Sequence, residues 1–211
     1  MRVIAIDGPA GAGKSTIARA LAERLGLQYL DTGAMYRAVT FAALRRGVDV
    51  DDISAIGELA EGLGLVVDDG RVHVDGVDAS TEIRSSAVTS AVSVVAANSR
   101  VRRELRSRQR DWVEERGGGV VEGRDIGSVV FPDAELKLYL TASPRTRAER
   151  RVAQAGGDVD EIATAIAERD RLDSTRSDSP LTEASGAVIV DTTGLSVDEV
   201  LDRIIGMLRA T

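Results

Sequence analysis

Several residue types are missing or scarce in this sequence of 211 residues. It contains no cysteine, which excludes a disulfide framework and thiolate chemistry. The single histidine, His73, excludes metal sites built from several histidines and argues against a Ser–His–Asp triad. Aromatic residues are only 3% of the chain, so the core must consist mainly of Ala, Val, Leu and Ile, and few rings can stack on nucleic-acid bases.

The chain also lacks long hydrophobic runs and an excess of positive charge. No stretch approaches the roughly 18 apolar residues of a membrane span, and an apolar strand at the N-terminus leaves no room for a signal peptide. The net charge of −7 disfavours nucleic acid as a partner. We therefore expect a cytoplasmic protein without a membrane or nucleic-acid partner. Its 43% of hydrophobic residues suffices for the core of one compact domain over residues 1–211.

A phosphate-binding loop is the clearest motif. Residues 8–15, with the sequence GPAGAGKS, fit the pattern G-x-x-x-x-G-K-[ST]. The apolar run 2–7 predicts a buried strand before the loop, and the spacing of Ile17, Leu21 and Leu25 predicts a helix after it. Only two of the 27 basic residues are lysines, and one of them, Lys14, lies in this loop. The strand–loop–helix context favours a functional loop over a glycine-rich turn that binds nothing.

The chemistry of this loop follows from its residue types. Glycines let the backbone approach an anion closely, and the N-terminus of the following helix favours negative charge. We expect Lys14 to reach the β- and γ-phosphates of ATP and the Ser15 hydroxyl to bind Mg²⁺. The residues expected around the ATP phosphates are Gly8, Pro9, Ala10, Gly11, Ala12, Gly13, Lys14, Ser15 and Thr16.

Five apolar runs alternate with helical patterns along the chain. The predicted strands cover residues 2–7, 28–30, 120–122, 136–140 and 187–191. Strands that are separated by helices form a parallel sheet with crossover connections. The predicted fold class is therefore α/β, with a five-stranded parallel sheet flanked by helices.

Two regions depart from this alternation. Residues 65–74 form two β-rich runs around Asp-Asp-Gly, which predicts a β-hairpin insertion near 65–81. Gly156-Gly157 separates two arginine-rich helices, which indicates either a mobile lid over about 153–176 or a solvated, salt-bridged face. The remaining core covers about 1–31, 118–152 and 177–211, and about 32–117 forms a substrate-binding region.

Two segments near strand ends carry candidate acceptor-binding groups. Thr32 and Arg37 begin a predicted helix, where they suit a second phosphate, although an ordinary capped helix explains them equally well. Arg124 and Asp125 follow the strand 120–122, at the edge where open α/β sheets bind ligands. This second pair is either a substrate reader or a structural salt bridge.

A phosphate-binding loop alone does not separate a kinase from a GTPase or an ATPase. The guanine-reading motif Asn/Thr-Lys-x-Asp of G-proteins is missing after the late strands, which end in Thr141-Ala142-Ser143 and Asp191-Thr192-Thr193. A motor or transport ATPase needs an apolar strand that ends in a metal-anchoring acid, and Glu122 is the nearest match. The GTPase is thus disfavoured, and the ATPase is weakened but stays open.

Taken together, the motifs resemble bacterial cytidylate kinases, which are nucleoside monophosphate (NMP) kinases that make CDP from CMP and ATP. The resemblance rests on the phosphate-binding loop, on residues 30–37, on residues 122–132 with Gly-Arg-Asp-x-Gly and Phe-Pro, and on residues 168–173. It extends over about residues 2–208. It implies a P-loop NMP-kinase fold with an NMP-binding insertion and a short mobile lid, dCMP as a further acceptor, and a monomer.

The resemblance also implies roles for individual residues. Those expected to bind the CMP phosphate are Thr32, Arg37 and Arg124, and those expected to read cytosine are Ser93, Arg102 and Asp125. Those expected to hold the ribose are Arg169 and Asp173, and the catalytic set is Lys14, Arg124, Arg150, Arg169 and Arg176. Arg150, Arg169 and Arg176 are expected to close on the ATP phosphates. The lid departs from the family pattern, because Leu172 and Ser174 stand where relatives often carry arginine.

Cytosine recognition by Asp125 also makes chemical sense. The 4-amino group of cytosine donates a hydrogen bond that a carboxylate accepts, whereas uracil places an oxygen there. A buried polar mismatch discriminates strongly between two such ligands. A kinase for another small acceptor such as UMP, and a regulatory P-loop ATPase without a small acceptor, remain the alternatives.

Overall fold

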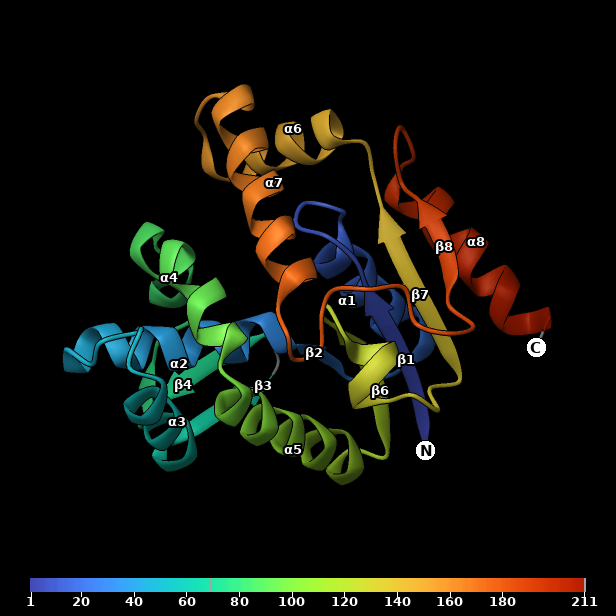
Figure 1. The fold of residues 1–211 in the computed structure, drawn as a ribbon. Helices are drawn as coiled ribbons and strands as arrows, with labels where there is room; N and C mark the ends of the chain where they lie inside the picture. The colour runs from blue at the N-terminus through green and yellow to red at the C-terminus, as the bar shows by residue number, and fades with distance from the viewer. Residues whose placement is uncertain (69, 211) are drawn as a thin grey trace.

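The computed structural model describes residues 1–68 and 70–210 (Figure 1). Its central sheet has the strand order β2-β6-β1-β7-β8, and every neighbouring pair is parallel. The strands are β1 (Arg2–Asp7), β2 (Tyr29–Asp31), β6 (Gly118–Glu122), β7 (Leu136–Thr141) and β8 (Val188–Asp191). This confirms the predicted α/β class and the five-stranded parallel sheet, and it brings the carboxyl ends of all five strands to one edge.

The central strand β1 shows why these residues form a sheet that is buried on both faces. Val3 and Ala5 face one hydrophobic core, whereas Ile4 and Ile6 face the other. Successive side chains of a strand point to opposite faces, so a strand between two helical layers must be apolar throughout. The continuous apolar run of the sequence is the signature of this position.

Helices cover both faces of the sheet. They are α1 (Lys14–Leu25), α2 (Thr32–Arg46), α3 (Ile53–Gly62), α4 (Ser86–Ala97), α5 (Ser99–Glu115), α6 (Pro144–Ala155), α7 (Val159–Thr175) and α8 (Val197–Ala210). The core on one face includes side chains from α1 and α8, and the core on the other includes side chains from α2, α3 and α5. Figure 1 shows α6 and α7 above the carboxyl ends of the strands, where the phosphate-binding loop lies.

A second, smaller sheet lies beside the main one. It is antiparallel and has the order β3-β4-β5, with β3 (Leu65–Asp68), β4 (Arg71–Val74) and β5 (Val77–Asp78). The predicted hairpin is confirmed as β3 and β4, although Asp69 in its turn lies outside the described residues, and the third strand was not predicted. The indole Nε1 of Trp112 on α5 donates to the carbonyl of Val67 at 3.0 Å, which ties this sheet to the core.

Some boundaries differ from the sequence prediction. The strand predicted over 120–122 begins two residues earlier, because Gly118 and Gly119 also belong to β6. A Cβ on Gly118 would lie 2.3 Å from the carbonyl oxygen of Arg2, so only glycine fits this close approach of two strands. Two short helical turns also went unpredicted, the 3₁₀ turn η1 (Glu82–Arg84) and the π-helical turn η2 (Ile126–Val130).

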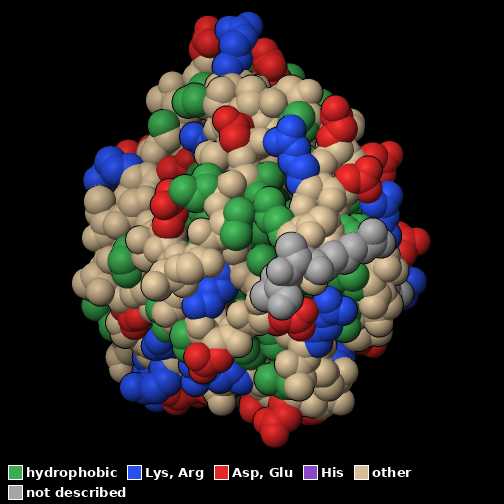
Figure 2. Space-filling view, turned by 90° about the vertical axis from the view of Figure 1, so that its right-hand side faces the viewer, with side chains coloured by type: hydrophobic (Ala, Val, Ile, Leu, Met, Phe, Trp, Pro, Cys, Tyr) green, Lys and Arg blue, Asp and Glu red, His purple; other side chains and the backbone are tan. Residues whose placement is uncertain are grey.

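The surface beside β8 and α8 carries charges of both signs. Figure 2 shows acidic and basic side chains interspersed on this face, with hydrophobic side chains between them. Among the hydrophobic residues exposed in this part of the chain are Ile189 on β8 and Val197 on α8. Within the described residues, none of the helices combines the length and the apolar character that crossing a membrane requires.

Candidate functional site

The phosphate-binding loop connects β1 to α1, as its motif predicts. Gly8, Gly11 and Gly13 all have positive φ angles, which permit the tight turns of the loop. A Cβ on Gly8 would lie 2.0 Å from the carbonyl oxygen of Leu140 on β7, so the loop needs glycine there. The loop therefore presents its backbone at the carboxyl edge of the sheet.

Lys14 is buried in this loop and points back along it. Its Nζ donates to the carbonyl oxygen of Pro9 at 2.8 Å. Burial lowers the pKa of Lys14, and the nearby positive charge of Arg124 lowers it further. An ammonium group held this way gains from a neighbouring anion, as a nucleotide phosphate would supply.

Three oxygen groups lie together at the start of α1. Glu122, the buried last residue of β6, accepts a hydrogen bond from the hydroxyl of Tyr29 and interacts with the hydroxyl of Ser15. Burial raises the pKa of Glu122, and the nearby Asp31 adds to the effect. Mg²⁺ prefers oxygen ligands and is usually held by one or two protein groups together with phosphate and water. The Ser15 hydroxyl with the Glu122 carboxylate fits this requirement. No cluster of three or more His, Cys, Asp or Glu residues suited to a metal occurs in residues 1–68 and 70–210.

The predicted phosphate-binding pair on α2 is largely buried. The Thr32 hydroxyl donates to the carbonyl of Glu122 at 2.7 Å. The guanidinium of Arg37 donates to the Thr89 hydroxyl at 2.9 Å and to the Ile83 carbonyl at 3.3 Å. Burial lowers the pKa of Arg37 to about 10, and the neighbouring charges of Arg169 and Arg151 contribute. Arg37 is thus a buried cation whose pKa the positive charges of Arg169 and Arg151 lower further.

The loop after β6 places Asp125 beside Arg102, another of the predicted base-reading residues. Arg102 on α5, which is 1% exposed, donates to the Asp125 carboxylate at 2.6 Å. Arg124 donates to Asp173 on α7 at 2.9 Å. Ser93 lies half-buried on α4. Residues that are far apart in the sequence thus meet beside Asp125.

Arg176 lies in the same group. Its nearest carboxylate atoms are those of Asp173 at 3.7 Å and Asp125 at 3.9 Å, and its Nε donates to the Ser179 carbonyl at 2.7 Å. The structure therefore places Arg176 on the Asp125 side of the site, whereas its expected role lay at the ATP phosphates.

Three buried guanidinium nitrogens of the site have no hydrogen-bond partner within the described chain. They are Nε of Arg102, Nε of Arg169 and Nη2 of Arg176.

Between the loop and Asp125 the site contains several buried cations that lower one another's pKa, with carboxylates among them. Burial lowers the pKa of Arg169 to about 10, and the charge of Arg124 is the next largest cause. The charges of Arg124 and Arg169 both lower the pKa of Lys14, and the charge of Arg169 also lowers the pKa of Arg37. We call Lys14, Arg37, Arg124 and Arg169 the cation cluster. Buried cations that destabilise one another form a site for an anion.

Helices α6 and α7 contact the phosphate-binding loop directly. The carboxylate of Asp170 on α7 accepts from the backbone N–H of Ala10 at 3.0 Å and pairs with Arg147 on α6. Arg147 also donates to the Ala10 carbonyl at 3.0 Å, and Arg150 donates to the Thr192 hydroxyl and carbonyl, each at 2.8 Å. No local pattern in the sequence marks Arg147 or Asp170, because their contacts join segments that are distant in the chain.

Asp7, the last residue of β1, is a further buried residue that the sequence analysis did not single out. It is 2% exposed, and its two carboxylate oxygens accept from the backbone N–H groups of Ile126 and Gly127, both at 2.8 Å. Burial raises the pKa of Asp7 to about 6, against the lowering effect of these two hydrogen bonds. The carboxylate therefore serves a structural purpose despite the cost of its burial.

The raised pKa of Asp7 predicts a specific pH dependence of stability. The pKa of Asp7 is about 6 in the folded state and has its ordinary value of 3.8 in the unfolded state. Well below pH 3.8 the carboxyl group is protonated in the folded and in the unfolded state. As the pH rises towards 6, it loses its proton first in the unfolded state. The folded state thus binds more protons in this window, so the contribution of Asp7 to the free energy of unfolding falls by about 3 kcal/mol and levels off above about pH 6. Denaturant unfolding of wild type and Asp7→Asn between pH 4 and 7 should show wild type losing stability relative to the variant. A difference that does not change with pH would contradict the assignment.

These features match one known family. The sequence matches the cytidylate kinase family over residues 4–210. The chain belongs to the cytidylate kinase family. The cytidylate kinase of Mycobacterium leprae is 50% identical to this chain, and the alignment covers 98% of this chain and 95% of that protein. The cytidylate kinase of Rhodococcus opacus is also 50% identical, and the alignment covers 96% of this chain and 93% of that protein. The resemblance stated from the motifs is thereby confirmed.

Solved structures agree on the fold. The structure of TT1252 from Thermus thermophilus superposes on this chain with a TM-score of 0.53 and 18% sequence identity. The superposition covers 99% of this chain and 96% of TT1252. At this identity the similarity shows the fold alone. Membership of the cytidylate kinase family favours a kinase over the regulatory ATPase that the loop by itself left open.

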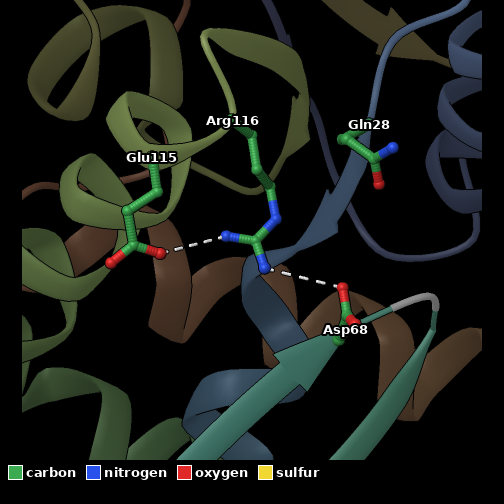
Figure 3. A pocket seen from close by; sticks show the side chains of 4 residues that line it. All are labelled: Gln28, Asp68, Glu115 and Arg116. Atoms are coloured by element: carbon green, nitrogen blue, oxygen red, sulfur yellow. Dashed lines mark hydrogen bonds and ion pairs between the residues drawn. The ribbon is translucent and has the colours of Figure 1, made fainter.

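This member of the cytidylate kinase family also has an open hollow away from the candidate nucleotide site. It is lined by Gln28, Asp68, Glu115 and Arg116 (Figure 3). Gln28 directly precedes β2, so the hollow lies at the amino edge of the sheet, opposite the phosphate-binding loop. Arg116 pairs with Glu115 at 3.3 Å and Asp68 at 3.5 Å, and its guanidinium stacks on the Trp112 ring at 4.4 Å. These contacts join the small sheet to α5, which is a structural role.

Proposed function

We propose that the chain is a nucleoside monophosphate kinase that transfers the γ-phosphate of ATP to CMP, and also to dCMP, to give ADP and CDP or dCDP. The cation cluster is the observation that carries this proposal. It extends from the phosphate-binding loop at Lys14 to the neighbourhood of Asp125, and burial and mutual repulsion lower the pKa of Lys14, Arg37 and Arg169. Such a cluster is stabilised when anionic phosphates of a donor and an acceptor lie within it.

The donor half is assigned to residues 8–16. The backbone of the loop and the N-terminus of α1 would hold the ATP phosphates, and Lys14 would turn from the Pro9 carbonyl towards them. Ser15 would bind Mg²⁺, with Glu122 orienting it. When bound, the metal neutralises charge on the β- and γ-phosphates.

The acceptor half is assigned to the opposite end of the cluster. Arg37 and Arg124, with the Thr32 hydroxyl, would bind the CMP phosphate. This phosphate is already an anionic nucleophile, so the protein needs no general base. Its task is to align the two phosphates and to neutralise their charge, to which Arg169 would contribute because its charge acts on both Lys14 and Arg37.

The base and the sugar are assigned to groups that converge beside the loop after β6. Asp125 would accept from the 4-amino group of cytosine, while Arg102 and Ser93 complete the recognition of the base. Asp173 and Arg169 would hold the ribose. The guanidinium nitrogens of Arg102, Arg169 and Arg176 that have no hydrogen-bond partner in the described chain support this assignment, because a ligand would accept hydrogen bonds from them.

Residues 153–176 are proposed to form a lid. The core then comprises residues 1–31, 118–152 and 177–211, and residues 32–117 form the NMP-binding region. Closure would exclude water, which otherwise hydrolyses ATP. Arg150 would act at the ATP phosphates because it already contacts Thr192 beside the loop, and we place Arg176 at the acceptor instead. The enzyme is further proposed to act as a cytoplasmic monomer without a nucleic-acid partner.

Changing Glu122 to glutamine should weaken the use of Mg²⁺. The amide keeps the size of the side chain but removes the negative charge beside Ser15. Loss of an orienting partner typically costs 10–100-fold in metal affinity, so we expect the Mg²⁺ concentration for half-maximal activity to rise about 10-fold. Calorimetry of ATP binding with and without Mg²⁺ provides a readout independent of turnover. An unchanged Mg²⁺ requirement in both assays would remove Glu122 from the metal site.

Identification of the products tests the proposed reaction. Wild-type protein, Mg²⁺, ATP and CMP are incubated, and the nucleotides are separated by ion-exchange chromatography. We expect CDP and ADP to form in equal amounts. ADP without CDP would indicate an ATPase, and conversion of neither nucleotide would contradict the assignment as a kinase.

A further inference from the structure

The loop that carries Asp125 is held by β1 in an unusual way. The turn η2 begins directly after Asp125, so its first backbone N–H groups have no partner within the turn. The residue before a helix commonly accepts these groups with its own side chain. Here the carboxylate of Asp7 accepts both Ile126 N–H and Gly127 N–H, from a strand 119 and 120 residues earlier in the sequence.

This arrangement leaves the Asp125 side chain available for other contacts. Asp125 directs one carboxylate oxygen to Arg102 at 2.6 Å, and its other oxygen lies 3.9 Å from Arg176. A carboxylate that capped the turn would point back along its own backbone. It would not face Arg102 and Arg176, beside which we place the base.

Further contacts confine the same loop. The N–H of Gly123 donates to the carbonyl of Ile6 at 2.9 Å, so β1 holds the loop at both of its ends. A Cβ on Gly127 would lie 3.2 Å from Lys137 Cγ and 3.3 Å from Ala184 Cβ, so the backbone at Gly127 has little room to shift. The orientation of Asp125 is therefore set by a backbone that β1 holds through three hydrogen bonds.

We propose that Asp7 is a positioning residue for pyrimidine recognition, because it caps η2 in place of Asp125 and thereby fixes Asp125 towards the exocyclic group of the base. This inference rests on the proposed function, since it assumes that Asp125 reads the 4-amino group. It assigns the discrimination between a 4-amino and a 4-oxo pyrimidine to two residues, Asp7 at the end of β1 and Asp125 in the loop after β6. Asp7 directly precedes Gly8. This residue therefore connects the phosphate-binding loop, where ATP would bind, to the loop that carries Asp125.

Asp7→Asn is the sharpest test, because asparagine keeps the shape but offers a single acceptor oxygen. Its NH₂ group would face one of the two backbone N–H groups and leave that group unpaired. We expect the ratio of kcat/KM for CMP to that for UMP to fall about tenfold, mostly through a higher KM for CMP, while the KM for ATP changes less than about twofold. This ratio does not depend on the fraction of folded enzyme, so a loss of stability alone does not alter it. If Asp7→Asn yields no folded protein, Asp7→Ser is measured in the same way.

Two further variants make the outcome unambiguous. Asp52 caps α3 by accepting from Ser54 N–H and Ala55 N–H, both at 3.0 Å, so Asp52→Asn alters a comparable cap and should leave the ratio unchanged. Asp125→Asn should change the ratio strongly. If Asp125→Asn changes it and Asp7→Asn does not, the positioning role of Asp7 is wrong while the proposed reading of the base stands. If neither changes it, the reading of the base by Asp125 fails, and the role of Asp7 fails with it.

Discussion

Replacing Lys14 with methionine is expected to lower kcat at least about 100-fold, because loss of one preorganised electrostatic group typically costs 10²–10³ in rate. The ammonium group is buried in the phosphate-binding loop and lies within reach of the transferred phosphoryl group in the proposed complex. Methionine retains an unbranched chain of similar length but removes the charge. The rate is measured as CDP formation at saturating ATP and CMP.

The sequence offers a matched control for this change. Lys137 is the second of the two lysines, and its Nζ donates to the Ser185 carbonyl at 3.2 Å on the surface. Lys137→Met should leave kcat within about twofold of wild type. The free energy of unfolding of Lys14→Met should not fall, because burial disfavours the charged form of Lys14. A Lys14→Met enzyme with more than a tenth of wild-type kcat would contradict the role of Lys14.

Replacing Asp125 with asparagine is expected to shift the enzyme from CMP towards UMP. The carboxylate only accepts hydrogen bonds, whereas the amide also donates. Arg102 already donates to Asp125 at 2.6 Å, so the amide oxygen would keep that contact and the NH₂ group would face the base. This group opposes the 4-amino group of cytosine and matches the 4-oxygen of uracil.

The expected size of this shift follows from the value of one base contact. A good polar contact to a base is worth about 1–3 kcal/mol of discrimination, which is roughly 5–150-fold in the ratio of kcat/KM for CMP and UMP. Asparagine is preferable to alanine, because alanine would leave the fully buried Arg102 without its carboxylate partner and destabilise the fold. The KM for ATP serves as the internal control. An Asp125→Asn enzyme with the wild-type preference for CMP would exclude Asp125 as the reader of the base.

The parts of the site that could be predicted from the sequence are those formed by neighbouring residues. The phosphate-binding loop and the strand β1 each depend on a local pattern, and the structure shows them as predicted. The hairpin of β3 and β4 is also local. Position near strand ends marked Thr32, Arg37, Arg124 and Asp125 as candidates for binding an acceptor, whereas their individual roles toward CMP came from the resemblance to cytidylate kinases.

The contacts that went unpredicted join residues far apart in the chain. Asp170 and Ala10 are separated by 160 residues, and Asp7 and Ile126 by 119. A single sequence contains no information on such distances, and a buried aspartate at the end of a strand looks like an ordinary surface residue. The π-helical turn η2 depends on the same long-range contact, so no local pattern predicts it.

The most direct test of the account is ADP production from Mg²⁺ and ATP with CMP, dCMP, UMP, AMP and GMP offered separately. The cation cluster with Asp125 at its acceptor end predicts strong stimulation by CMP, a similar effect of dCMP, and little by UMP. Equal rates with all five acceptors, or no rate above that of ATP alone, would contradict it.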